Sequence, residues 1–316
     1  MNSTLLFSHL SSHQFPSFFL NISNKLLSFK LPLVIVKKDY GQLGNRLHTH
    51  TNVLAWCIKN NLNFLNLSFR DYVKAFPKST NVFAKSTLYN YILIKLIYKY
   101  SIVYNFLSRL CLSDKNLKKI SSFVHIIDCQ NDEILNEQTL DQHLDQKRGS
   151  ILLLIRAWDV RCPKALHANT IKLKTILSPT DLINKRVVVI KKSLSQYDFI
   201  VGVHVRRGDY ETWLNGKYFF SWKQYSNWVI ELESLLLEGG KKPAFIICSD
   251  EKIPSNYFSN KSTICSQSDA LIDLFTLSSC NIIIGPPSSF SSWASFYGNT
   301  KKVNLVSEIK LKDACK

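Results

Sequence analysis

The sequence lacks the cysteine and histidine spacings that build metal sites. Its eight cysteines form no C-x-x-C pair, and no histidine stands at the spacing of a metal ligand. Cys248 and Cys280 lie in or beside apolar runs, where a reduced thiol behaves as a small hydrophobic side chain. We therefore expect no bound metal and a reducing, cytoplasmic environment.

Long hydrophobic runs, internal repeats and low-complexity tracts are also missing. No stretch approaches the roughly 20 apolar residues that a membrane-spanning helix needs. The N-terminal segment has no basic start, no uninterrupted apolar stretch and no small-residue cleavage site. Residues 1–30 are accordingly interpreted as a short extension or an interfacial segment.

Acidic residues are scarce, because 40 Lys and Arg stand against 23 Asp and Glu and give a net charge of +17. Such a charge favours an anionic partner: nucleic acid, a membrane surface or a phosphorylated small molecule. The lysines are scattered as on an ordinary solvated surface, so charge alone does not choose among these partners. With 46% hydrophobic residues, the 316-residue chain is long enough for two globular domains.

The hydrophobic pattern predicts an α/β fold with two Rossmann-like, doubly wound domains. From Asp198 onward, the apolar strands FIVGVHV, AFIICSD, STIC, NIIIG and KKVNLV are interspersed with helical patterns at 221–237, 269–280 and 288–298. Strands without polar alternation indicate a parallel sheet covered on both faces. Before them, strands are expected at 31–36, 62–67, 121–129 and 149–158, and helices after the glycine loop and at 87–110 and 179–196.

These elements suggest a domain at 31–195 and another at 196–316. An architecture of this kind is typical of nucleotide-sugar transferases, which bind their ligand in a cleft between the domains at the carboxyl ends of the strands.

The motif His204-Val205-Arg206-Arg207-Gly208-Asp209 follows the strand FIVGVHV directly. By composition alone, H-x-R-R-x-D is expected on the order of once in several thousand such chains. Arginine carries a fork of donors that matches phosphate, and two of them can hold a diphosphate and stabilise its charge as it leaves. Because adjacent residues of an extended strand point in opposite directions, one arginine is expected to bind phosphate and the other to brace the site. A surface turn with an Arg–Asp pair is the alternative.

Three further segments follow strands in the same way. The loop Gly41-Gln42-Leu43-Gly44-Asn45-Arg46 precedes a helix, whose N-terminal amides favour an anion. Ser288 and Ser289 follow NIIIG and precede another helix, where an N-cap role explains only one of the two. Asp250, in Ser-Asp-Glu after AFIIC, fits a capping turn as well as a ligand contact.

Taken together, these blocks resemble the GDP-fucose-dependent fucosyltransferase superfamily. The motifs VHVRRGDY and D-L-x-x-L-S-x-C…S-S-F-S-x-W are most similar to bacterial-type α-1,2-fucosyltransferases of glycosyltransferase family 11. The resemblance covers residues 31–58 and 199–300. It implies a GT-B-like fold and a metal-independent, inverting transfer of L-fucose from GDP-β-L-fucose to a glycan or lipid-linked oligosaccharide in surface polysaccharide synthesis. No cofactor other than the donor substrate is implied.

The resemblance also implies roles for individual residues. Arg206 would bind the β-phosphate and Arg207 would support the motif, while Ser289, next to Ser288, would lie at the β-phosphate. His204 and Asp273 would lie at the guanosine end, and Leu43, Gly44 and Asn45 would offer backbone amides to the diphosphate and sugar. The candidates for the general base are Asp209, Glu211 and Asp39, and Asp209 is favoured, although it is also placed to hold an arginine.

Departures from the family pattern leave the linkage open. The loop GQLGNR has one glycine fewer at its start than is usual, and the serine block carries a single Trp. A transferase with α-1,6 linkage or another GDP-sugar is the alternative enzyme. A nucleic-acid-binding protein is the alternative outside enzymes, but the aromatic residues cluster in helical patterns and are not interleaved with basic residues on a sheet. The basic, aromatic segment Lys85 to Lys119 is compatible with peripheral contact at the inner face of a membrane.

Overall fold

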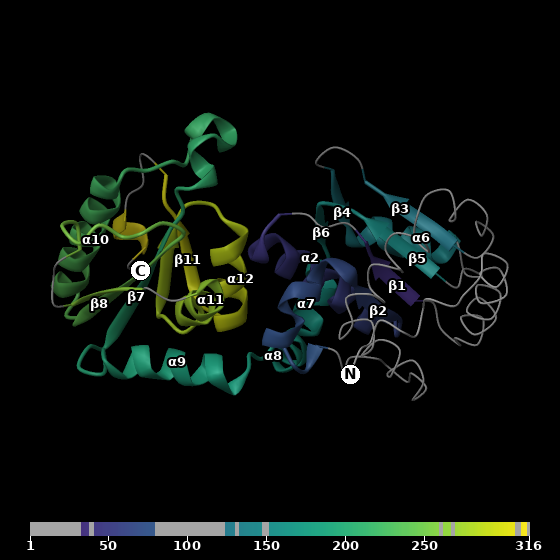
Figure 1. Cartoon of the computed structure of the whole chain (residues 1–316), viewed down its shortest axis with the longest axis horizontal. Helices are drawn as coiled ribbons and strands as arrows, with labels where there is room; N and C mark the ends of the chain where they lie inside the picture. Colours follow the sequence, from purple (N-terminus) through teal and green to yellow (C-terminus); the bar gives the residue numbers. More distant parts are fainter. Residues whose placement is uncertain are drawn as a thin grey trace, which may run out of the picture. The chain divides into compact units, whose positions relative to one another are not determined.

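The structure is a computed structural model that describes residues 33–37, 41–79, 124–129, 133–146, 152–258, 262–266, 269–306 and 311–314 (Figure 1). The predicted extension at 1–30, the helix at 87–110, the membrane-surface segment and the candidate base Asp39 all lie outside the described residues. Within the ranges above, each helix is too short or too polar to cross a bilayer.

The described residues belong to two compact units. The first unit draws on residues 1–40, 49–70 and 80–173, and the second on 41–48, 71–79 and 174–316. The sequence had placed a domain boundary between residues 195 and 196. The helix α9 (Asp181–Lys192), which precedes that point, packs against α11 (Ala270–Ser278) of the second unit, so the structure divides the chain earlier.

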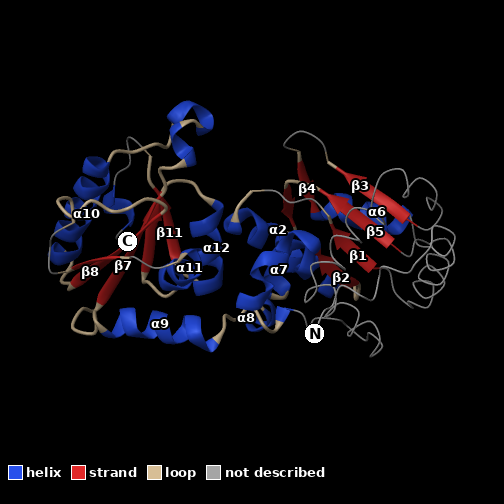
Figure 2. Ribbon diagram, viewed as in Figure 1, coloured by secondary structure: helices blue, strands red, loops and turns tan. Residues whose placement is uncertain are grey.

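A four-stranded parallel sheet forms the centre of the first unit, in the order β2-β1-β5-β3 (Figure 2). Its strands are β1 (Leu33–Val36), β2 (Asn63–Asn66), β3 (Val124–Asp128) and β5 (Leu152–Arg156). Two short strands, β4 (Ile134–Asn136) and β6 (Asp159–Arg161), which precede and follow β5 in the sequence, form a separate parallel pair. The helices α6 (Glu137–Gln146) and α7 (Pro163–Ala168) also belong to this unit, whereas α2 (Leu43–Lys59), η2 (Leu67–Ala75) and α8 (Thr170–Ile176) each have residues in both units.

The second unit contains a five-stranded parallel sheet in the order β11-β10-β7-β8-β9. Its strands are β7 (Phe199–Val205), β8 (Pro243–Ser249), β9 (Thr263–Cys265), β10 (Ile282–Gly285) and β11 (Lys301–Asn304). The helical segments are α9, α10 (Trp222–Glu238), α11 and α12 (Ser289–Gly298), with the short turns η5 (Asp209–Glu211), η6 (Trp213–Gly216) and η7 (Leu311–Ala314). Every strand and helix predicted from Asp198 onward is present.

Alternation along β7 explains how the sheet is covered on both faces. Val201, Val203 and Val205 point into a core shared with α10 and η7. Gly202 points the other way, where a Cβ atom would lie 2.7 Å from Leu277 Cδ2 of α11. The glycine therefore allows α11 to pack closely on the sheet, and the side chains that share its face, including His204, are directed toward α11 and α12.

Local signals set the bounds of the helices. Ser221 and Gln224 form a reciprocal capping box at the start of α10, and Asp269 accepts two backbone N–H bonds at the start of α11. Asn299, in the left-handed region at φ 55°, ends α12. One predicted loop is different: α2 begins at Leu43, so Leu43 to Arg46 form its first turn and are not part of a loop before it.

Candidate active site

Arg206 leaves the carboxyl end of the central strand β7 and is held by three side chains. Its Nε and Nη2 atoms lie 2.8 and 2.9 Å from the two carboxylate oxygens of Asp209, and Nη1 lies 3.2 Å from Asp250 Oδ2. Nη2 also donates to Gln42 Oε1 at 3.2 Å. These contacts hold the guanidinium in position, and because the side chain is 18% exposed, solvent still reaches it.

The guanidinium of Arg207 has other partners. Its Nε pairs with Glu251 Oε2 at 3.0 Å, and Nη1 donates to the carbonyl oxygen of Phe220. The guanidinium lies over the rings of Phe219 and Trp222, at 4.4 and 5.4 Å from their centres. The two guanidinium groups therefore have different partners, as expected of adjacent residues at a strand end, while the assignment of one arginine to phosphate and the other to bracing stays a prediction.

Asp250 shapes the loop between the arginines and η5. Its carboxylate accepts the backbone N–H groups of Arg207 at 3.0 Å and Gly208 at 3.1 Å while it pairs with Arg206. Asp250 therefore holds the loop after β7 and does not cap the segment that follows its own turn, in which Ser249 Oγ accepts the backbone N–H of Glu251 at 3.1 Å. Direct contact between Asp250 and a ligand stays a prediction.

The first turns of α2 and α12 approach each other closely at Gly44. A Cβ atom on Gly44 would lie 2.6 Å from the backbone nitrogen of Phe290 and 2.7 Å from Ser289 Oγ. Both segments belong to the second unit. Ser288 is the N-cap of α12, and its Oγ accepts the N–H of Phe290 at 3.2 Å. The predicted glycine and serine segments therefore do come together, through a contact that only a glycine permits.

Tyr210 connects this helix terminus to Arg206. Its hydroxyl donates to the carbonyl oxygen of Pro287 at 2.6 Å, and its ring centre lies 5.9 Å from the Arg206 guanidinium carbon. Burial raises the pKa of Tyr210, which therefore stays a neutral donor. The contacts of Gln42 and Tyr210 thus link Arg206 to the first turns of α2 and α12, and both residues were left without a role by the sequence motifs.

His204 is buried, with 4% of its surface exposed, and stacks on Phe290 at 5.1 Å between ring centres. Burial, reinforced by the positive charges of Lys302 and Arg206, lowers the pKa of this imidazole to about 3, so it is neutral at physiological pH. Its Nδ1 atom has no hydrogen-bond partner among the described residues. A buried polar atom of this kind is costly unless a ligand or water satisfies it.

Asp273, on α11, is also buried, with 5% of its surface exposed. It accepts a hydrogen bond from the Ser266 hydroxyl and interacts with the Cys248 thiol, and Cys248 is the register partner of His204 across the sheet. Burial raises the pKa of Asp273 from 3.8 to about 6. The two residues that the resemblance assigns to one end of the ligand therefore lie near each other on the same face of the sheet.

Lys302, on β11, is a charged residue of this site that the sequence did not reveal. Its ammonium donates to the Ser288 carbonyl oxygen at 3.2 Å and to Ser292 Oγ at 2.9 Å. Burial lowers the pKa of Lys302 to about 8, and no carboxylate of the described segments contacts it. Its ammonium form is destabilised by burial beside the positive end of a helix and would be favoured by an anion bound nearby. In the sequence, Lys302 belongs to one of several Lys-Lys pairs, and nothing in that pattern distinguishes it from a surface lysine.

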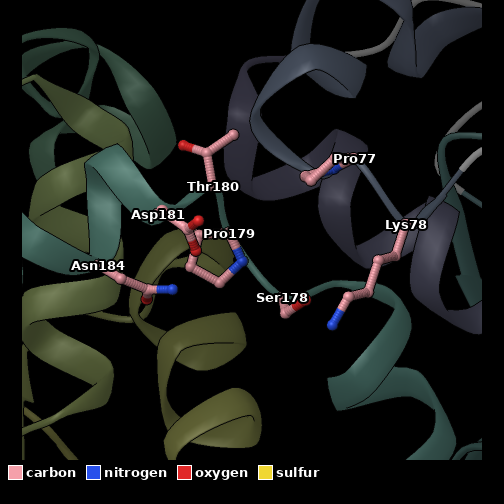
Figure 3. Close-up of a pocket in the computed structure, with 7 residues that line it drawn as sticks. All are labelled: Pro77, Lys78, Ser178, Pro179, Thr180, Asp181 and Asn184. Carbon is pink, nitrogen blue, oxygen red and sulfur yellow. The ribbon is translucent and has the colours of Figure 1, made fainter.

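A separate pocket of about 450 Å³ lies elsewhere in the second unit, around the start of α9 (Figure 3). Its lining consists of Pro77, Lys78, Ser178, Pro179, Thr180, Asp181 and Asn184. Each of the predicted site residues lies outside this lining. Groups of three or more metal-ligating side chains are absent from the part of the chain that the structure describes.

Comparison with solved structures finds fucosyltransferases. The Arabidopsis thaliana protein FUT1, in complex with GDP, is 13% identical, with 90% of this chain and 73% of that chain aligned at a TM-score of 0.51. POFUT1 in complex with GDP-fucose is 11% identical, with 89% and 98% aligned at a TM-score of 0.52. NodZ from Bradyrhizobium, an α-1,6-fucosyltransferase, is 16% identical, with 84% and 92% aligned at a TM-score of 0.49.

The first two likenesses confirm the mixed α/β, GT-B-like fold that the sequence predicts. No model of a known protein family matches the chain, and no curated protein matches it either. The predicted resemblance to GDP-fucose-dependent enzymes is thus confirmed at the level of the fold, while the α-1,2 subgroup stays a prediction.

Proposed function

We propose that this protein is a metal-independent glycosyltransferase that transfers L-fucose from GDP-β-L-fucose to a hydroxyl group of a glycan. The observation that carries the proposal is the fixed guanidinium of Arg206 at the carboxyl end of β7, linked through Gln42 and Tyr210 to the first turns of α2 and α12. In parallel α/β sheets this edge binds ligands, and helix N-termini favour phosphate. The fold shared with FUT1 and POFUT1 adds support for this class of donor.

The chemistry of the buried end suits guanine. The N1–H and N2–H groups of guanine form a donor pair that a carboxylate such as Asp273 accepts, and adenine offers no such pair. His204, neutral and with a free Nδ1 atom, supplies a further hydrogen bond. The pair therefore favours a guanosine nucleotide over other nucleotides.

Transfer requires stabilisation of the departing GDP. In the proposed reaction, Arg206, the N-terminal amides of α12 beside Ser289, and Lys302 would stabilise the negative charge that develops on the β-phosphate as its bond to fucose breaks. The acceptor oxygen attacks the anomeric carbon from the opposite side and inverts its configuration. Asp209 or Glu211 would receive the acceptor proton, and the linkage would be α-1,2, with α-1,6 as the alternative. The setting would be the cytoplasm, at or near a membrane that carries lipid-linked acceptors.

Calorimetric titration with GDP in EDTA tests the donor site. We expect micromolar binding by the wild type, loss of at least about tenfold in affinity for Arg206→Ala, and no change for Arg186→Ala, an exposed arginine on α9 of the same unit. Titration with ADP and UDP provides the comparison between bases. Equal affinity for the three nucleotides, or GDP binding that Arg206→Ala leaves intact, would refute the proposed donor site.

A further inference from the structure

The loop that follows Arg206 and Asp209 exposes large apolar side chains. Trp213 is 43% exposed and Leu214 is 56% exposed, and both lie in η6, a few residues beyond the strand end. Exposed apolar groups on a loop next to a candidate active site often mark a place where a ligand binds.

Aromatic rings connect this loop to the candidate active site. The ring of Trp213 lies between that of Tyr210, at 4.8 Å between centres, and that of Tyr218, at 5.8 Å. Tyr210 in turn contacts Arg206 and the residue before Ser288. Trp213 is therefore held one ring away from the arginine proposed to bind the diphosphate.

The backbone of the loop adopts a conformation that is unfavourable for one of its residues. Leu214 has φ 49° and ψ 41°, Asn215 has φ 56° and ψ 38°, and Gly216 has φ 72°. Asparagine and glycine tolerate the left-handed region, but leucine does not favour it. A strained leucine whose side chain is mostly in solvent gains little from packing in the free protein. Strain of this kind is typically retained where it serves binding.

We propose that Trp213 and Leu214 form a sugar-binding subsite that holds the glycan acceptor beside the donor fucose. A pyranose ring presents a face of C–H groups, which packs on an indole ring and a leucine side chain. Its hydroxyl groups can bond with the polar side chains of the same loop, Glu211, Asn215 and Lys217. The inference rests on the proposed function, because that function places the reacting fucose next to Arg206.

Three substitutions test the subsite without touching the donor-binding residues. Trp213→Ala removes the ring, Trp213→Phe keeps an aromatic face, and Leu214→Gly removes the side chain while suiting the left-handed backbone. Leu237→Ala is the matched control, since Leu237 on α10 is also 56% exposed. Each variant is measured for GDP affinity by calorimetry, for binding to a glycan array with and without GDP, and for melting temperature.

We expect Trp213→Ala to lose about tenfold or more in affinity for the glycans that the wild type binds, while its GDP affinity stays within about twofold. Trp213→Phe should recover most of the loss. Leu214→Gly should weaken glycan binding without lowering the melting temperature, because glycine suits the left-handed backbone at this position. If Leu214 only stabilised the fold, the substitution would lower the melting temperature as well. Where an array glycan also accepts fucose, the Michaelis constant for that acceptor should rise and the one for GDP-fucose should not.

Several outcomes would overturn the inference. One is a wild type that binds GDP but no glycan on the array, and another is glycan binding that Trp213→Ala leaves unchanged. A Trp213→Ala variant that alters only self-association or liposome binding would assign this surface to a second copy or to a membrane. If the wild type binds glycans, Trp213→Ala does not, and neither protein binds GDP, the proposed donor is refuted while the proposed sugar-binding subsite is supported.

Discussion

Replacement of Asp273 by asparagine should make the protein more stable and at the same time weaken its binding of GDP. The pKa of Asp273 is raised from 3.8 to about 6 because its carboxylate is buried, so ionisation of this group opposes folding. A shift of this size corresponds to about 3 kcal/mol at pH values above both pKa values. Asparagine has nearly the same shape, keeps an oxygen for the Ser266 hydroxyl and carries no charge.

The sign of the pH dependence follows from proton counting. Between the unfolded pKa of 3.8 and the folded pKa of about 6, the folded protein binds more protons than the unfolded chain, so wild-type stability falls as pH rises. The advantage of Asp273→Asn should therefore be about 3 kcal/mol at pH 8, about half of that at pH 5 and absent below the unfolded pKa. Guanine needs a carboxylate that accepts two hydrogen bonds, so GDP affinity should be lower in the variant than in the wild type above about pH 6. Below about pH 6 the wild-type carboxyl group is protonated, and its GDP affinity should fall toward that of the variant.

Urea unfolding at pH 5 and pH 8, followed by circular dichroism, measures the stability difference. Ser266→Ala provides the opposite control, because removal of the Ser266 hydrogen bond should raise the pKa of Asp273 further and lower stability at pH 8. A gain for Asp273→Asn that is the same at both pH values would show that charge burial is not its cause. A variant less stable than the wild type at pH 8 would refute the reasoning outright.

Two further substitutions test the surroundings of α12. Gly44→Ala places a methyl group within 2.7 Å of Ser289 Oγ, so it should cost about 1–3 kcal/mol of stability, measured by urea unfolding. It should also lower GDP affinity about tenfold, measured by calorimetry. Unchanged stability and unchanged affinity would contradict the close contact. The pKa of Lys302 is lowered to about 8, so the wild type loses this positive charge above pH 8, and its GDP affinity should fall by up to about tenfold per pH unit. Lys302→Met has no such charge to lose, so the GDP affinity of the variant should not change over this range. Parallel pH profiles for the two proteins would exclude Lys302 from the phosphate site.

The sequence predicted the second unit well because its strands are continuous apolar runs between clear helical patterns. A run such as NIIIG reads as a strand buried on both faces, and polar residues directly after such runs must gather at one edge of a parallel sheet. This is why the arginines after β7, the acidic turn after β8 and the serines after β10 could be placed from the sequence alone.

The residues that were missed owe their roles to contacts across the fold. Lys302 belongs to an ordinary Lys-Lys pair, and only the position of α12 over β11 buries its ammonium. Likewise, the need for Gly44 comes from the backbone of α12, far away in the sequence. The first unit was harder to interpret because strands such as β4 and β6 have three residues each, too few for a period to be recognised.

The charges around Arg206 suggest an order of events for the proposed reaction. Asp250 holds the loop and Glu251 pairs with Arg207, whereas Asp209 is 57% exposed and Arg206 is its one charged partner among the residues that the structure describes. A diphosphate that binds Arg206 would compete with Asp209 for the same guanidinium, and Asp209, the more exposed of the two carboxylates on it, would be released. The two roles considered for Asp209 then do not exclude each other. It would hold the arginine in the free enzyme and become available as a base for the acceptor hydroxyl only after the donor has bound.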